Sequence, residues 1–205
     1  MAGLVSVLFV LAVIGSIVAM FVLLARAGAK IQAAEDAALT QLATQHGLTV
    51  RPSGSREFSA SSGEDGALRM STSHDTKPGN GSRDHLRLVA RSTRALPAIV
   101  VRNRELAGEV TELSPSFHEL STGDAEFDAR FVTSVEDDAA ARALLDAHKA
   151  ELASFSTRAR SGLELLKLGS EVVLMIDTTF ERDFFKDGRA DRAMQLVKRL
   201  ATGAA

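Results

Sequence analysis

The feature that most constrains this chain of 205 residues is an uninterrupted apolar run at its start. Residues 2–25 carry no charged side chain, and nearly all of them are apolar. A helix of about 24 residues is about 36 Å long, enough to cross the hydrocarbon core of a bilayer with some tilt. Lipid offers the backbone no hydrogen-bond partners, so such a run favours a helix. We therefore expect residues 1–26 to form a transmembrane anchor, with residues 2–25 in the lipid bilayer.

A cleaved signal peptide is the alternative interpretation of this run. The apolar region of a signal peptide is about 7–15 residues long and follows a basic start. Here the apolar region is longer, and no Lys or Arg precedes it. Small residues that suit a signal peptidase do follow, at Ala25, Ala27 and Ala29. The length and the missing basic start favour a retained anchor over a cleaved leader.

The charges beside the run predict its orientation. Arg26 and Lys30 follow it directly, whereas only the α-amino group precedes it. Positive residues beside a membrane segment tend to stay in the cytoplasm. We therefore expect a single-pass protein whose soluble domain is cytoplasmic. The chain has no cysteine, which excludes disulfides, a cysteine nucleophile and thiolate metal sites on either side of the membrane.

About 180 residues follow the anchor, which suits one domain with its own core. Residues 27–47 are predicted to form a connecting helix, because apolar residues recur at helical spacing and Gly47 suits its end. Residues 48–205 are predicted to form the soluble domain. Its chain offers little to nucleic acid, since the formal net charge is −2 and both Trp and Tyr are absent. We expect no nucleic-acid partner.

Strand patterns follow the connecting helix through the middle of the chain. Short stretches of strand-forming residues are separated by turns that contain Gly or Pro. The predicted strands are residues 48–50, 57–61, 67–73, 85–93 and 98–102. Residues 77–81 contain Pro78 and two glycines, which predict a loop between two of these strands.

A second pattern occupies the start of the later half. Residues 124–130 alternate strictly between charged and apolar side chains, which is the period of a half-buried strand. Ser134 stands three residues before Asp137, a spacing that resembles a capping box. We therefore expect a strand over residues 124–130 and a helix that begins near Ser134.

The end of the chain predicts a hairpin and a helix. The apolar runs 163–168 and 171–177 flank a Gly-Ser pair, which is a typical hairpin turn. Residues 189–201 have an apolar stripe at helical spacing and predict an amphipathic helix. Because the strands cluster between helices instead of alternating with them, we expect an α+β fold with a mainly antiparallel sheet and packing helices.

Four segments share their pattern of packing positions with a known group of proteins. They are ALTQLATQHGLTV (residues 38–50), LPAIVVRNREL (96–106), TGDAEFDARFVTSVEDDAAARALL (122–145) and LELLKLGSEVVLMI (163–176). In these segments the chain resembles uncharacterised bacterial single-pass membrane proteins with a small α+β domain of unknown function. The resemblance covers residues 31–200, loosely between 51 and 82. It implies the architecture and a place in the bacterial inner (cytoplasmic) membrane, and it carries no activity and no site residue.

Arginines crowd the stretch from residue 83 to residue 104, with Asp84 the only acid among them. Such a stretch could contact anionic lipid headgroups or another polyanion. The candidate residues for this contact are Arg83, Arg87, Arg91 and Arg94. Residues two apart in a strand share a face, so His85, Arg87 and Arg91 are expected on one face. The alternatives are that the arginines are ordinary solvated surface charges, which the sequence favours, or that they pair across the sheet with Asp124, Glu126 and Asp128.

Three further groups of polar residues could form sites. The acidic trio Asp124, Glu126 and Asp128 has the spacing of the start of a calcium loop, but Ala129 and Val135 stand where Gly and Glu are required, which favours a solvated strand face. His148 is expected at the edge of the core on a helix. The third group flanks the 77–81 loop and could bind zinc if its side chains converged, although independent polar loop residues are favoured. It consists of His74, Asp75, Asp84 and His85.

The chain contains no nucleophile elbow, phosphate-binding loop, dinucleotide fingerprint or His-Glu-x-x-His zinc motif. We therefore expect no cofactor. The favoured hypothesis is a membrane-anchored interaction or scaffolding domain without catalytic chemistry, whose partner is another protein or a further copy of this chain. Two alternatives stay open: a module that senses anionic lipid through its arginine-rich strand, and an enzyme or ligand binder with an unrecognised site.

Overall fold

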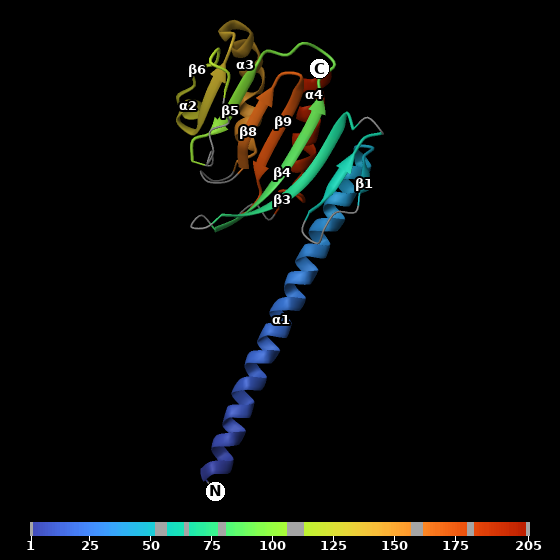
Figure 1. Cartoon of the computed structure of the whole chain (residues 1–205), viewed down its shortest axis with the longest axis vertical. Helices are drawn as coiled ribbons and strands as arrows, with labels where there is room; N and C mark the ends of the chain where they lie inside the picture. The colour runs from blue at the N-terminus through green and yellow to red at the C-terminus, as the bar shows by residue number, and fades with distance from the viewer. Residues whose placement is uncertain are drawn as a thin grey trace. The chain divides into compact units, whose positions relative to one another are not determined.

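A long N-terminal helix and a nine-stranded antiparallel sheet make up most of the described chain in this computed structural model (Figure 1). The structure describes residues 2–51, 57–63, 66–77, 81–105, 113–156, 162–179 and 183–203, and their side chains except those of residues 2–18, 77 and 81. The chain divides into two units, Met1–Leu39 and Thr40–Ala205.

Helix α1 (Ala2–Gln45) is continuous across the predicted anchor and the predicted connecting helix. Among the residues that the structure describes, no helix is long and apolar enough to span a membrane. The helix ends where the sequence predicts, because Gly47 adopts the left-handed conformation with φ +72°. The Leu48 N–H then donates to the Ala43 carbonyl at 2.8 Å, and the Gly47 N–H donates to the Thr44 carbonyl at 3.0 Å. These two bonds form a Schellman cap.

The sheet joins all the strands that the described residues form, and every neighbouring pair is antiparallel. The strands are β1 (Thr49–Arg51), β2 (Ser59–Ser61), β3 (Leu68–Lys77), β4 (Gly81–Arg91), β5 (Ile99–Asn103), β6 (His118–Leu120), β7 (Phe131–Val135), β8 (Gly162–Leu168) and β9 (Glu171–Asp177). Their order is β1-β2-β3-β4-β9-β8-β5-β7-β6. The predicted α+β fold with an antiparallel sheet and packing helices is confirmed.

The predicted strands in the middle of the chain correspond to β1–β5, and the predicted terminal hairpin is β8–β9. Strands β3 and β4 are longer than predicted, because their polar ends continue the ladder as far as Lys77 opposite Gly81. Residues 78–80, in the predicted loop, lie outside the described residues.

The predicted strand over residues 124–130 is wrong, because helix α2 (Ala125–Arg130) occupies this stretch. The Asp124 carboxylate caps the helix by accepting a hydrogen bond from the Phe127 N–H at 3.1 Å. Phe127 is buried, whereas Ala125 and Ala129, which a strand would place on the same side, are exposed. A helix of one and a half turns is compatible with the same short alternation of charged and apolar residues. The alternation alone therefore does not distinguish a strand from a helix here.

The predicted start of the next helix at Ser134 is also wrong. Ser134 lies inside β7 and is buried, and helix α3 (Asp138–Ser154) begins after Asp137. The Asp137 carboxylate accepts a hydrogen bond from the Ala140 N–H at 3.1 Å and caps α3. Asp competes with Ser as an N-cap residue, and here the aspartate lies next to the helix.

One face of the sheet is apolar and covered by helices. A row of directly paired residues crosses five strands on this face, and each of its side chains is fully buried: Met70, Leu88, Leu174, Leu166 and Val101. Helix α4 (Arg189–Thr202) contacts β4 and β9, and Figure 1 shows α3 and α4 behind the sheet. We call this side the covered face and the opposite side the open face.

Candidate functional site

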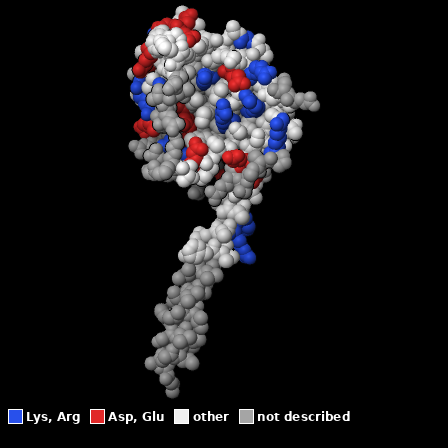
Figure 2. All heavy atoms as spheres, in the orientation of Figure 1, with Lys and Arg blue, Asp and Glu red and all other residues white. Residues whose placement is uncertain are grey.

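The open face carries a group of basic side chains. A cross-strand row runs over it through Ser71, Arg87, Met175, Leu165 and Arg102. Figure 2 shows Lys and Arg side chains gathered over the central strands on this face. We call four of them the basic surface: Arg87 and Arg91 on β4, Arg102 on β5 and Lys167 on β8.

The basic surface lacks acidic partners within the part of the chain that the structure describes. Arg87, Arg91 and Lys167 are exposed, and none of the four residues makes an ion pair there. Glu171 lies opposite Arg91, but its carboxylate is bound by Arg69 at 2.8 Å. Cations that share a face without counterions repel one another, and a nearby anion would lower this repulsion.

Arg102 differs from the other three because it is half-buried and one of its donors is not used. Its Nε atom is buried and has no hydrogen-bond acceptor. Leu165 and Val132 are its direct neighbours on the two adjacent strands, and both are apolar. Buried N–H groups in proteins nearly always have an acceptor. The Nε–H of Arg102 is therefore an exception, since its acceptor is missing.

The structure places the four arginines predicted as a lipid contact in three different settings. Arg87 and Arg91 lie together on the open face, as predicted. Arg83 is half-buried on the same strand, and its guanidinium is 3.7 Å from the Asp177 carboxylate. Arg94 lies beyond the sheet and donates from Nε to the Leu200 carbonyl at 3.3 Å, where it caps the end of α4.

The acidic trio pairs with none of the four arginines within the described residues. Asp124 caps α2 and lies 3.8 Å from Lys149. Asp128 accepts hydrogen bonds from Ser121 and Thr122. Desolvation alone would raise the pKa of Asp128, but these hydrogen bonds outweigh it and lower the pKa below its ordinary value. The alternative of pairing across the sheet is therefore wrong: Asp124 and Asp128 serve local structure, and Glu126 is exposed.

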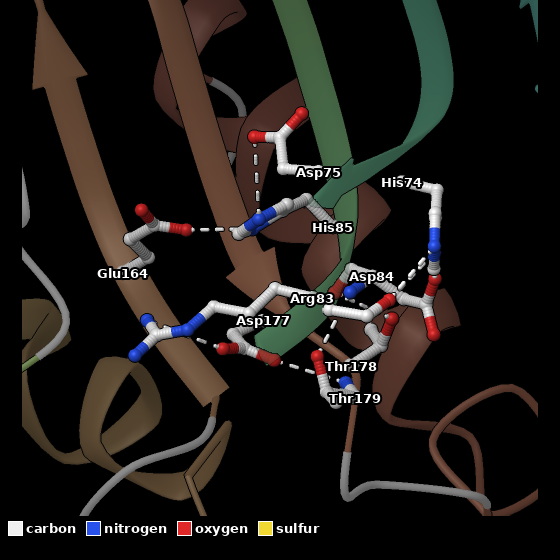
Figure 3. Close-up of polar contacts among 10 residues, drawn as sticks. His74, Asp75, Arg83, Asp84, His85, Glu164, Asp177, Thr178 and Thr179 are labelled. Carbon is white, nitrogen blue, oxygen red and sulfur yellow. Dashed lines mark hydrogen bonds and ion pairs between the residues drawn. The ribbon is translucent and has the colours of Figure 1, made fainter. Parts of the chain in front are cut away.

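An ionic cluster lies beside the basic surface on the same face, near the start of β8 (Figure 3). Its centre is His85, which is only 5% exposed and lies on β4. The Nδ1 atom is 2.8 Å from the Glu164 carboxylate, and Nε2 is 3.6 Å from the Asp75 carboxylate. Asp177, opposite His85 on β9, is fully buried and also faces Arg83. The imidazole is thus surrounded by three carboxylates.

The contact between His85 and Glu164 is an ion pair more than a hydrogen bond. The two atoms are close, yet neither has a hydrogen-bond partner of good geometry. Glu164 raises the pKa of His85 above its ordinary value, and Asp177 and Asp75 add to this effect, whereas burial lowers it. A base oriented by a carboxylate can serve in catalysis, but among the described residues the contacts recorded for His85 are with carboxylates and none is with a hydroxyl group.

The four residues proposed for zinc do not converge. His74 and Asp84 face each other across β3 and β4, with Nδ1 and Oδ1 2.6 Å apart, and they point to the opposite side of the hairpin from His85 and Asp75 (Figure 3). Among the described residues, no three His, Cys, Asp or Glu side chains lie together as metal ligands. The residues are strand residues joined in pairs, not independent loop residues as the sequence favoured.

Glu164 is the member of the cluster that the sequence did not reveal. A register shift between Leu163 and Leu165 places a bulge at this residue in β8. The bulge lets Glu164 reach His85 while Leu165 still faces the open side opposite Met175. A bulge leaves little trace in a single sequence; the one available signal is the pair Leu165-Leu166, which interrupts the alternation of the run.

His148 lies on α3 and is half-buried, as predicted for a residue at the edge of the core. Its Nδ1 atom is 3.9 Å from the Glu151 carboxylate. Burial lowers the pKa of His148 below its ordinary value, despite the opposing effect of Glu151. The same Glu151 carboxylate binds Arg199 of α4 at 2.7 and 2.8 Å, which ties the two helices together.

The raised pKa of His85 predicts how stability depends on pH. A raised folded-state pKa stabilises the fold below the unfolded value of about 6.5, and this gain is lost as the pH rises through the folded pKa. We expect the free energy of unfolding, relative to that of His85→Gln, to be larger at about pH 6 than at about pH 9. Urea unfolding of both proteins at each pH measures this difference.

The comparison with His85→Gln removes the contribution of His148, whose lowered pKa has the opposite sign and destabilises the fold at low pH. His118→Gln is a matched control, since this histidine is exposed and pairs with Asp138 at 2.6 Å, far from the cluster in the sheet order. If His85→Gln and the unmodified chain differ equally at both pH values, the ionic cluster does not hold a proton as described.

No protein-family model matches this chain, and no match is found among curated proteins or solved structures.

Proposed function

We propose that this chain is a membrane-anchored domain without catalytic chemistry that docks on anionic lipid headgroups through its basic surface. The observation that carries the proposal is that four cations share the open face of the sheet without a carboxylate partner among the described residues. Near an anionic membrane each Lys or Arg gains about 1 kcal/mol, so four together supply at most about 4 kcal/mol. A free domain would bind weakly with this energy.

A membrane tether makes weak binding sufficient, because it raises the local concentration of the domain at the lipid surface. The uncharged run of residues 2–25 supports an anchor at 1–26, followed by the connecting residues 27–47 and the domain at 48–205. Arg26 and Lys30 support an orientation with the domain in the cytoplasm. The cytoplasmic leaflet is the one whose surface is negative. The resemblance described above supports the bacterial inner membrane.

A protein partner is the other candidate for the open face. Leu165, Met175 and Val132 are half-buried there among the arginines, and Met and Arg are common in protein interfaces. The charge of the basic surface favours lipid, because it is unneutralised over several strands and a layer of headgroups can meet all four cations at once. We therefore treat protein recruitment as a competing outcome of the test.

The test uses the full chain in lipid nanodiscs. Because the chain has no cysteine, Ser71→Cys gives a single labelling site on the open face next to Arg87. A fluorophore there is quenched when a lipid with a spin-labelled headgroup comes close. We expect more quenching when phosphatidylglycerol is added to phosphatidylcholine discs. The increase should disappear between about 0.05 M and about 0.5 M salt, as the screening length falls below the size of a side chain.

Arg87→Gln with Arg91→Gln should reduce the quenching to the level of neutral discs. Arg192→Gln is the matched control, since Arg192 is an exposed arginine on α4, which packs against the covered face. Quenching that ignores phosphatidylglycerol, or falls equally in the control, would contradict lipid docking and favour a protein partner. Failure of the chain to enter the discs would contradict the anchor.

A further inference from the structure

Two cations of the basic surface are close neighbours. Lys167 on β8 lies directly opposite Val100, and Arg102 lies opposite Leu165, so Lys167 and Arg102 are diagonal neighbours on the open face. Diagonal neighbours in antiparallel strands are about 7–8 Å apart, within reach of two long side chains. One anion can therefore contact both.

Among the described residues, the surroundings of this pair hold no free acceptor for it. The Arg102 Nε–H is buried and unused, and its neighbours across the two ladders, Leu165 and Val132, offer only carbon. The Glu119 carboxylate, on the far side of β7, is bound by Arg104 at 3.1 Å. Within the described chain the pair therefore has a net charge of +2 and one desolvated donor.

We propose that Arg102 and Lys167 form a subsite for a phosphomonoester dianion, presented by a lipid headgroup. This inference rests on the proposed docking function and names the headgroup that the domain prefers. A phosphomonoester carries a charge of about −1.5 to −2, which balances both cations, whereas a phosphodiester or a carboxylate carries only one negative charge. The guanidinium offers its two Nη groups as donors to phosphate oxygens, whereas its Nε is buried and out of reach of a headgroup. The Lys167 ammonium then meets a third oxygen as a point charge.

The experiment compares two anionic lipids in the nanodisc assay with the full chain. Phosphatidic acid is a phosphomonoester and phosphatidylglycerol a phosphodiester; the discs are matched in surface charge and kept at about pH 8, above the second phosphate pKa of about 6. We expect half-maximal quenching at an about tenfold lower fraction of phosphatidic acid, as one extra charge-assisted hydrogen bond would give.

Arg102→Lys keeps the charge and removes the two Nη groups that can bind two phosphate oxygens at once. It should abolish the preference for phosphatidic acid while docking on phosphatidylglycerol is retained. Arg87→Lys is the matched control and should retain the preference. Circular dichroism checks that each variant is folded. Lys167→Gln, which lies at an exposed position, gives a second independent loss of preference if Arg102→Lys disturbs the sheet.

The outcomes separate this inference from the proposed function. Docking without preference for phosphatidic acid overturns the subsite alone. Absence of docking on both lipids overturns the proposed function as well. Glycerol 3-phosphate added to neutral discs distinguishes the source of the phosphate: a label response that saturates at micromolar concentration would show a soluble ligand and overturn the lipid assignment, whereas a response only at millimolar concentration supports it.

Discussion

Replacing Gly162 by alanine is expected to destabilise the domain by about 3 kcal/mol. Gly162 opens β8 with φ +91°, a conformation that costs a residue with a Cβ about 1–2 kcal/mol. A Cβ there would lie 2.5 Å from the Phe155 carbonyl oxygen and closer still to Ser156. The overlap is with backbone, which cannot move aside cheaply, and adds about 1–3 kcal/mol. The close approach exists because the Leu163 N–H donates to the Ser156 hydroxyl at 2.9 Å.

Gly169→Ala is the matched control for this prediction. Gly169 lies in the turn after β8, has no positive φ, and a Cβ there would meet nothing within 4 Å. The alanine reduces the freedom of the unfolded chain, so we expect a small stabilisation, up to about 1 kcal/mol. Urea unfolding followed by circular dichroism measures both, since the chain has neither Trp nor Tyr for fluorescence. Equal urea midpoints for the two variants would show that the chain does not pack closely at Gly162.

Phe131→Ala is the second substitution with a large expected effect, a loss of about 3–5 kcal/mol. Phe131 begins β7 directly after α2 and is only 1% exposed. Its ring lies 4.7 Å from the ring of Phe127, so the substitution leaves a cavity between the helix and the sheet. The same urea experiment measures the loss.

Ala129→Glu tests the helical conformation of this segment. Ala129 is exposed on α2, and glutamate is a good helix former, so the change should alter the free energy of unfolding by no more than about 0.5 kcal/mol. In a strand over residues 124–130, Ala129 would share the inner side with Phe127, and a buried glutamate would be strongly destabilising. A large loss for Ala129→Glu would therefore argue for the strand and against α2.

The parts of the fold that could be predicted are those with a strong local cause. Gly47 ends α1 because a glycine alone adopts the required left-handed turn readily, and the turn at Gly169 closes the hairpin β8–β9. Helix α2 could not be predicted from periodicity, because it is only six residues long, and so short a segment does not separate a period of 2 from one of 3.6. The side chain of Asp124 favours the helix over a strand, because it accepts the Phe127 N–H and so caps the helix.

The candidate site was predictable only within one strand. Alternation along β4 places Arg87 and Arg91 on one face, and the structure agrees. Arg102 and Lys167 belong to the same surface because β8 and β5 are neighbours in the sheet, which is a long-range property that no local pattern encodes. The cluster at His85 depends in addition on the bulge at Glu164.

The strand order has a consequence for the synthesis of this protein. The hairpin β8–β9, residues 162–177, lies between β4 and β5, which precede it in the chain by many residues. Until the ribosome has released this hairpin, the inner edges of β4 and β5 lack their partners, and β5 and the later half of β4 are rich in aliphatic residues. Unpaired apolar edges recruit other chains. The nascent protein should therefore need a chaperone most after β5 has been translated and before residue 177 has left the ribosome, and mutations that slow the closing hairpin should first appear as lower yield.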